Sequence, residues 1–290
     1  MLLNKLTTRG IYITPTNVYW SFIKQNKNTI IENNHYSFAS TNLKLLEQFA
    51  KQLQIKHKEY SSRPHVIIDC SLCCIRIIKI GRSIKNNEFN KYIHCNDEQL
   101  FGCNINRMHY DYKLINKKKP TGNKQNNQSY YLLVAYKKDS IYQEILPKIV
   151  NIKKIKSIQV DSLSVSNIIN QTKVQSSICM YANNTICVIS HFNNKQLLGC
   201  YKHDISFNYE RSIEDISENI ISVCNKAKNI KNIIFTGENT PFINHAKIKF
   251  KKLTTTNQQH NNQYNYILQK KPYNFFATTA ALQGCILNVD

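Results

Sequence analysis

The chain has 290 residues, of which 42% are hydrophobic and 10% aromatic, so it is long and apolar enough for one large two-lobed domain or two ordinary ones. This composition excludes an intrinsically disordered chain. Lys and Arg number 39 against 18 Asp and Glu, a net charge of +21. Such a surplus suits nucleic acid or an anionic membrane. The basic residues are mostly Lys and run along the whole chain, which argues against a dedicated nucleic-acid site.

The sequence carries no secretory signal and no run of 18 apolar residues, because Arg76 and Lys79 interrupt its most apolar stretch. We therefore expect a cytoplasmic chain whose ten cysteines stay reduced. Cys70 and Cys73 have the spacing of a metal or redox pair, but no second pair of this spacing exists. The sequence accordingly predicts buried structural cysteines and no metal site.

Residues 1–80 predict the first part of an α/β lobe. Short β-rich runs at Ile11–Ile13 and Val18–Ile23 flank a polar turn and indicate a hairpin, and a third strand follows near 29–36. Apolar residues at helical spacing, ending at Leu53, predict a helix capped by Thr41 or Asn42. Two more strands are predicted at 66–69 and 74–78.

Residues 81–157 predict an inserted subdomain. A polar helical stretch leads to strands at His109–Ile115 and Tyr130–Tyr136, followed by a helix from Asp139 and a strand that ends at Val160. Residues 158–176 are expected to return to the first lobe as a helix, with Asp161 as its N-cap.

Residues 177–290 repeat the pattern of the first 80 residues. A three-stranded meander is followed by a helix that begins near Ser212, a strand at Ile233–Phe235 and a last helix at Phe275–Ile286. This repetition predicts an internal duplication of two α/β lobes.

Six segments in this order resemble the actin/FtsA-like superfamily and, within it, the PilM family of type IV pilus assembly proteins. They are Gly10–Val18, Asp111–Leu114, Tyr131–Lys138, Val160–Asp161, Phe192–Leu198 and Ile234–Gly237. The resemblance implies an α/β, actin-like (ribonuclease H-like) fold with a small α+β insertion on the first lobe. It also implies a cytoplasmic protein, peripheral to the inner membrane, that binds the cytoplasmic tail of a PilN-like membrane protein.

The family's second implied property, ATP and magnesium binding between the lobes, fits this sequence poorly. Tyr12 and Tyr181 stand where the family carries Asp, and Glu238 replaces a Gly. The nearest acids that we identified, Glu32 and Asp161, lie outside the turns that follow Tyr12 and Tyr181. The residues left for phosphate contacts are Thr14, Thr16, Asn17, Asn183, Asn184, Thr185 and Gly237. Ordinary turn chemistry is the role that we expect for the turn residues among them, and phosphate binding is the alternative. We therefore expect no cofactor and no catalysis, and keep ATP with magnesium as the alternative.

The resemblance places the partner peptide in a groove between the first lobe and the insertion. The two insertion strands suggest the groove residues Tyr110, Tyr112, Leu114, Tyr130, Leu132, Val134 and Tyr136. Tyrosine-rich strands offer the flat amphipathic surface that is enriched at interfaces. The alternative is that these tyrosines cover the insertion's own sheet.

The leading functional hypothesis is a non-catalytic adaptor in a type IV pilus or DNA-uptake machine. It would bind a PilN-like tail, other inner-membrane or motor components, and peripherally the anionic membrane surface. The first alternative is an ATP-binding assembly protein gated by nucleotide. The second is a basic nucleic-acid-binding factor, for which the sequence contains no recognised motif.

Overall fold

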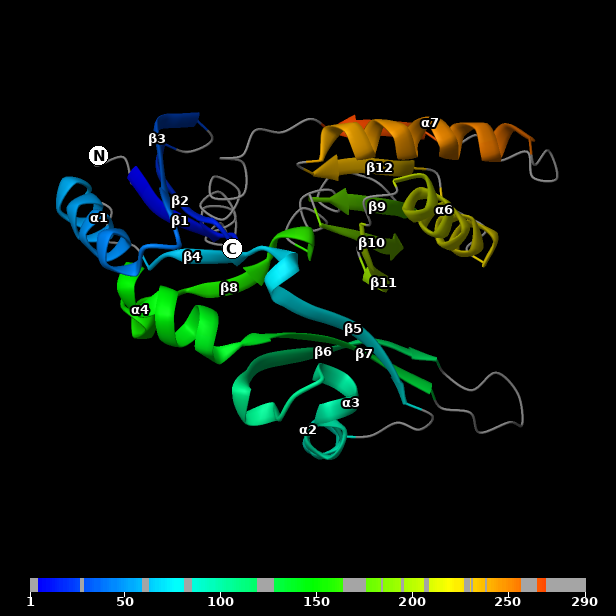
Figure 1. Ribbon diagram of the computed structural model, residues 1–290, viewed down its shortest axis with the longest axis horizontal. Helices are drawn as coiled ribbons and strands as arrows, with labels where there is room; N and C mark the ends of the chain where they lie inside the picture. Colours follow the sequence, from blue (N-terminus) through cyan, green and yellow to red (C-terminus); the bar gives the residue numbers. More distant parts are fainter. Residues whose placement is uncertain are drawn as a thin grey trace.

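The computed structural model describes residues 5–26, 29–58, 63–80, 85–118, 128–163, 176–183, 185–193, 196–205, 209–226, 230, 232–237, 239–256 and 265–269. Two α/β lobes lie side by side, and a third, smaller unit lies beneath them (Figure 1). The strands of the predicted N-terminal hairpin and those of the predicted meander in the second half belong to separate five-stranded sheets. The predicted fold class, an actin-like pair of lobes with an insertion, is confirmed.

The first lobe is built on a mixed sheet with the strand order β3-β2-β1-β4-β8. Its strands are β1 (Lys5–Ile13), β2 (Asn17–Asn26), β3 (Thr29–Ala39), β4 (His65–Ile68) and β8 (Ser157–Val160). The first three form an antiparallel meander, and β4 and β8 then join β1 in parallel. Since β1, β4 and β8 run in the same direction, their carboxyl ends meet at one edge of the sheet.

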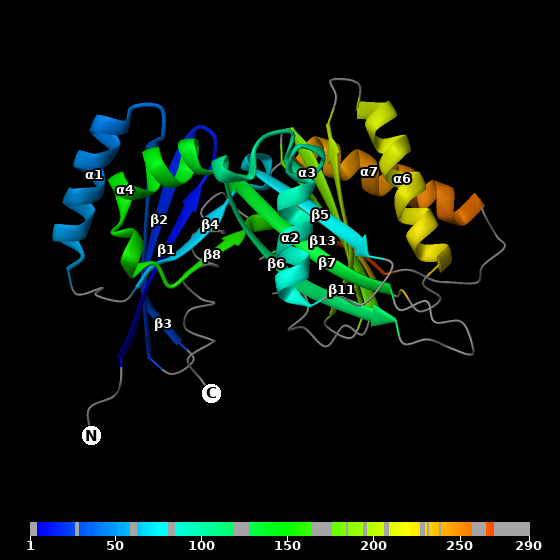
Figure 2. The ribbon, with the colours of Figure 1, turned by 90° about the horizontal axis from the view of Figure 1, so that it is seen from below.

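Helix α1 (Leu43–Lys56) covers one face of this sheet. It begins at Asn42, whose side chain accepts a hydrogen bond from the Leu45 backbone N–H at 3.1 Å. Leu46, Ala50 and Leu53 follow at helical spacing and are buried against the strands. Beside α1 lies helix α4 (Leu146–Ile149), which continues a π-helical segment, η3 (Lys138–Ile145) (Figure 2).

The second lobe repeats this plan with the strand order β11-β10-β9-β12-β13. Its strands are β9 (Ser176–Ala182), β10 (Ile186–Asn193), β11 (Gln196–Asp204), β12 (Asn232–Gly237) and β13 (Asn265–Gln269). Helices α6 (Tyr209–Lys226) and α7 (Thr240–Thr256) pack on one face of the sheet through a shared apolar core. Every residue of β9 is buried, as expected for a central strand covered on both faces.

The insertion is a three-stranded antiparallel sheet in the order β5-β7-β6. It comprises β5 (Cys73–Ile80), β6 (Met108–Lys118) and β7 (Gln128–Lys137), with helices α2 (Asn86–Cys95) and α3 (Asp97–Phe101) on one face. The 3₁₀ turn η1 (Cys70–Leu72) leads from β4 into the insertion, and η2 (Ile105–Arg107) leads from α3 into β6. A further 3₁₀ turn, η4 (Ile152–Lys154), joins α4 to β8. The insertion has a small hydrophobic core of its own, in which Phe89 stacks on Tyr131 with ring centroids 3.8 Å apart.

Several predicted boundaries need correction. The strand β5 pairs with β7, so the insertion begins at Cys73 rather than at residue 81. The predicted strand that ends at Val160 is β8 (Ser157–Val160), so residues 158–160 do not belong to the expected return helix, and residues 152–154 form a 3₁₀ turn before it. Helix α7 and strand β13 were not predicted at all. The predicted last helix, Phe275–Ile286, lies outside the described residues.

One of the three hydrophobic clusters formed by the described residues spans both lobes and the insertion. Tyr181, Val188 and Cys200 of the second lobe belong to the same buried cluster as Ile13 of β1 and Ile75 of β5. Apolar side chains therefore hold the two lobes together where they meet. Among the described helices, none has both the length and the apolar character needed to cross a lipid bilayer.

Candidate functional site

Tyr12 of β1 lies in the buried contact between the two lobes, which we call the cleft. The Tyr12 side chain is fully buried and stacks on Tyr19 with ring centroids 5.9 Å apart. Its hydroxyl lies 3.2 Å from Oδ2 of Asp69 and 3.2 Å from Oδ2 of Asp161. One phenol thus serves two buried carboxyl groups at the carboxyl ends of the parallel strands.

The two aspartates occupy equivalent positions, each directly after a parallel strand. Asp69 follows β4 and accepts hydrogen bonds at Oδ1 from the Ser71 backbone N–H (2.7 Å) and from Asn183 Nδ2 (2.9 Å). Asp161 follows β8 and accepts at Oδ1 from the Cys70 backbone N–H at 3.0 Å. Burial, and then the neighbouring Asp69, raise the pKa of Asp161 well above its ordinary value.

Our sequence reasoning identified Asp161 but overlooked Asp69. The signal was present, because Asp69 ends a fully buried β-branched run, and polar residues at the carboxyl ends of parallel strands commonly face the functional crevice.

The second lobe contributes Tyr181 and Asn183 to the same place. Tyr181 is buried in β9, and its hydroxyl, close to Asp161, partly offsets the rise in the pKa of that carboxyl. Asn183 ends the strand, and its Oδ1 accepts hydrogen bonds from the backbone N–H groups of Thr185 (3.0 Å) and Ile186 (2.8 Å). The Asn183 amide is thereby fixed with its Nδ2 directed across the cleft at Asp69.

The other predicted phosphate contacts are used within their own turns. Thr14 Oγ1 accepts from the Asn17 backbone N–H at 2.9 Å and donates to the Asn17 carbonyl oxygen at 3.0 Å. Thr16 Oγ1 accepts from Asn17 Nδ2 at 3.0 Å. At Gly237, which has φ +130°, a Cβ atom would lie 2.0 Å from the carbonyl oxygen of Ala182, so this position requires glycine for strand contact. Asn184 and Glu238 lie outside the described residues.

This cleft does not fit a magnesium nucleotide. The Asp69, Cys70 and Asp161 ligand atoms lie within 4.8 Å of one another, which is close enough to surround a cation. Burial, with the two aspartates beside it, raises the pKa of the Cys70 thiol, so this sulfur stays protonated. The carboxyl groups already accept hydrogen bonds from Tyr12, Asn183 and backbone N–H groups. These carboxyl groups and this thiol therefore form part of a buried hydrogen-bonded network between the lobes rather than a metal site.

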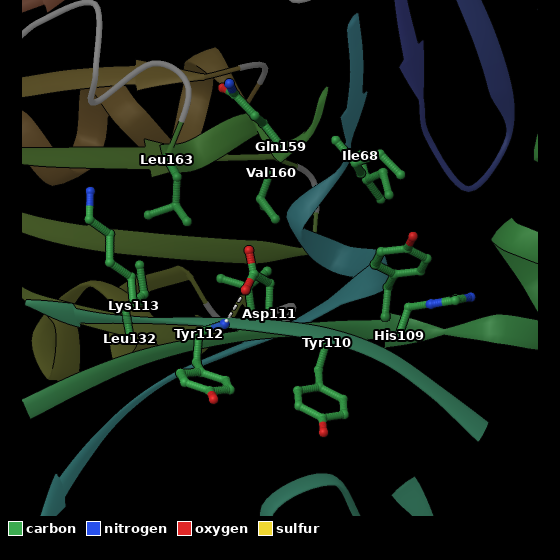
Figure 3. Close-up of a pocket in the computed structure, with 13 residues that line it drawn as sticks. Ile68, His109, Tyr110, Asp111, Tyr112, Lys113, Leu132, Gln159, Val160 and Leu163 are labelled. Atoms are coloured by element: carbon green, nitrogen blue, oxygen red, sulfur yellow. Dashed lines mark hydrogen bonds between the residues drawn. The ribbon is translucent and has the colours of Figure 1, made fainter. Parts of the chain in front are cut away.

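A cavity of about 540 Å³ lies between the first lobe and the insertion. One wall is formed by Ile68 of β4 and by Ile158 and Val160 of β8, with Leu163 beyond them. The facing wall is the sheet of the insertion, from which Asp111 and Lys113 of β6 point toward the first lobe (Figure 3). We call this cavity the groove. The strands on its two sides, β8 and β6, are the terminal strands of their sheets.

The structure corrects the predicted set of groove residues, because the strand β6 presents its other face. Tyr110 and Tyr112 border the groove, but their rings point away from it (Figure 3). The Tyr112 ring packs edge-on against Phe89 at 4.8 Å, and the Tyr110 hydroxyl donates to Asn90 Oδ1 at 2.6 Å. Leu114 packs in the same small core. These three side chains therefore cover the insertion's own sheet, which was the alternative role.

The groove face of the insertion is instead set by the cross-strand pairs of β6 and β7. His109 pairs with Tyr136, Asp111 with Val134 and Lys113 with Leu132, and all six border the cavity. The predicted Leu132, Val134 and Tyr136 are therefore groove residues, whereas Tyr130 does not border the cavity. Side chains alternate between the faces of a strand, so the face of β6 opposite the tyrosines carries His109, Asp111 and Lys113.

The insertion wall of the groove has an apolar base and carries charged groups of both signs above it. Leu132 and Val134 are half-buried and pack against the main core, while Asp111 and Lys113 are exposed above them. Burial, together with the nearby Lys138, lowers the pKa of His109, so its imidazole is neutral at pH 7. An apolar floor with a few placed polar groups is the typical surface of a peptide or ligand site.

No protein-family model matches the chain, and no curated protein matches it in sequence. Similarity is found in solved structures, at sequence identities that show the fold alone.

A structure described as a PilM–PilN type IV pilus biogenesis complex superposes with a TM-score of 0.60 at 11% identity, covering 96% of this chain and 98% of that one. A Bacteroides thetaiotaomicron protein with an actin-like ATPase fold and unknown function gives 0.50 at 13% identity, covering 94% and 95%. A ROK family protein from Streptococcus pneumoniae, in complex with sucrose, gives 0.50 at 9% identity, covering 96% and 97%.

Proposed function

We propose that this chain is a non-catalytic, actin-like adaptor that binds an extended peptide in the groove between its first lobe and its insertion. The partner is the cytoplasmic tail of a single-span, PilN-like membrane protein, and the complex is part of a pilus assembly or DNA-uptake machine. The chain then acts in the cytoplasm at the inner membrane. A net charge of +21 favours its approach to an anionic bilayer.

The observation that carries this proposal is the groove itself. Its floor is apolar, its rim presents Asp111 and Lys113, and the terminal strands β6 and β8 border it on opposite sides. Extended peptides bind such places by adding main-chain hydrogen bonds at a strand and by inserting alternate side chains into apolar pockets. A structure whose whole length superposes on this chain is named for a complex with PilN, which supports the choice of partner.

The non-catalytic part of the proposal rests on the cleft. Catalysis by an actin-like ATPase needs carboxylates that are free to hold magnesium and orient water. Here Tyr12 bonds both cleft carboxyl groups, and Asn183 bonds one of them from the opposite lobe. Neither the nucleotide-gated alternative nor the nucleic-acid alternative is favoured by a specific feature of the described residues.

The test is fluorescence anisotropy with labelled N-terminal tails of single-span membrane proteins encoded beside this chain. We expect saturable binding in the micromolar range at physiological salt. Ile158, on β8 at the groove, is 36% exposed, and Ile55, on α1, is 75% exposed. Ile158→Lys should weaken binding about tenfold or more, because it puts a charge on an apolar anchor site, while Ile55→Lys should leave binding unchanged. Equal effects of the two substitutions, or no saturable binding by the wild type, would refute the proposal.

A further inference from the structure

The two strands that form one wall of the groove end in the two buried aspartates of the cleft. Ile68 and Val160 are partners in the parallel pairing of β4 and β8, and both border the groove. The next residue along each strand is Asp69 or Asp161, and neither of these borders the groove. The hydrogen bonds of the two carboxyl groups therefore hold the ends of the two strands that form this wall.

The turn η1 is the direct covalent link between the two walls. It follows β4, which belongs to the first wall, and leads into β5, whose sheet forms the second wall. The path of η1 is therefore one of the features on which the spacing between the walls depends.

The second lobe holds η1 from the other side of the cleft. Lys202 of β11 donates from Nζ to the carbonyl oxygens of Cys70 (3.1 Å) and Cys73 (2.7 Å), at the two ends of this turn. Asn183 donates to Asp69, which immediately precedes the turn. Hydrogen bonds that involve a charged group in a partly buried place are strong and geometrically specific.

We propose that the cleft network of Tyr12, Asp69, Asp161, Asn183 and Lys202 positions the walls of the peptide groove, so that the second lobe controls tail binding without touching the tail. The inference rests on the proposed function of the groove. Side chains of this chain do what a bound nucleotide does in other two-lobed proteins, namely hold the lobes in one relative position. The five are positioning residues, because none of them borders the groove.

The decisive variant is Lys202→Met, which keeps the aliphatic stem and removes both hydrogen bonds to η1. Its matched control is Lys249→Met in the same lobe, which removes an ion pair with Glu214 (2.6 Å) on the surface formed by α6 and α7. Each purified full-length protein is examined by hydrogen exchange without peptide and by anisotropy with the labelled tail.

For Lys202→Met we expect faster exchange in η1 and also in β8, and a tail affinity reduced about fivefold or more, in the usual range of coupling between distant sites. Lys249→Met should match the wild type in both measurements. Tyr12→Phe, which removes the shared hydroxyl and keeps the ring, is the second variant if Lys202→Met does not fold, and it should act in the same direction.

Faster exchange confined to η1, or an unchanged tail affinity when β8 is loosened, would overturn the inference. Unchanged exchange everywhere in Lys202→Met would also overturn it. Hydrogen exchange needs no ligand, so a wild type that binds no tail would refute the proposed function while leaving this readout of the coupling intact.

Discussion

The substitution Asp161→Asn keeps the hydrogen-bonding shape of the protonated carboxyl group but removes its ability to ionise. Asp161 is fully buried, faces Asp69 and shares the Tyr12 hydroxyl with it. Two carboxylates this close cannot both ionise without cost, and burial adds to that cost. The introduced amide would keep the acceptor oxygen for the Cys70 backbone N–H and would stay neutral at every pH, much as the protonated carboxyl group is neutral.

The sign of the pH dependence follows from the raised pKa. A carboxyl group whose pKa is higher in the folded than in the unfolded chain stabilises the fold fully below its ordinary pKa, and this stabilisation is lost as the pH rises through the folded value. Each unit of elevation corresponds to about 1.4 kcal/mol. The wild type should therefore lose stability relative to Asp161→Asn as the pH rises above about 4, and the loss should stop at the pKa that Asp161 has in the folded chain. The total change in the difference between their free energies of unfolding should be about 1.4 kcal/mol for each unit by which folding raises this pKa.

The assay is urea unfolding between pH 4 and 9, followed by the fluorescence of Trp20, the single tryptophan, which is buried in the first lobe. Val160→Ala is the control, because it removes buried apolar contact beside the network and should lower stability by the same amount at every pH. A difference between Asp161→Asn and the wild type that does not change with pH would refute the reasoning.

Two further predictions concern the cleft and the second lobe. Addition of magnesium and ATP should leave the melting temperature of the wild type unchanged, because Tyr12 and Asn183 already bond the cleft carboxyl groups; a rise of several degrees would contradict this. Gly237→Ala should lower the free energy of unfolding by more than about 2 kcal/mol, because the new Cβ would lie 2.0 Å from the Ala182 carbonyl oxygen. A melting temperature of Gly237→Ala equal to that of the wild type would contradict this, because it would mean that β9 and β12 can move apart at no cost in free energy.

The repeated order of elements made the duplicated lobes predictable from the sequence. The strands of each lobe recur with the same turn and helix signals, and local patterns of this kind are what a single sequence carries. The pairing of β5 was not predictable in the same way, since an apolar strand can complete either sheet. Helix α7 left a signal that we overlooked: Phe242, Ala246 and Phe250 lie at helical spacing and are buried.

The contacts of the residues named from the sequence could be predicted only in part. Tyr12 and Tyr181 were identified as residues of the cleft, but their partners were not. The Tyr12 hydroxyl bonds Asp69 and Asp161, and the Tyr181 hydroxyl lies at Asp161; only Tyr181 and Asp161 are near each other in sequence. On β6, choosing Tyr110 and Tyr112 placed the groove on the wrong face of the strand. A period of two gives both faces equal standing in the sequence, and only the packing of α2 against the tyrosines decides between them.

The central claim, that the groove holds the tail of a membrane protein, is tested most directly by site-specific photo-crosslinking. A photoreactive amino acid replaces Lys113, which is exposed on β6 at the groove, or Ile248, which is 56% exposed on α7 of the second lobe. With the labelled tail at physiological salt, we predict a crosslink from position 113 that excess unlabelled tail abolishes, and none from position 248. Equal labelling from both positions, or labelling from position 248 alone, would contradict the account.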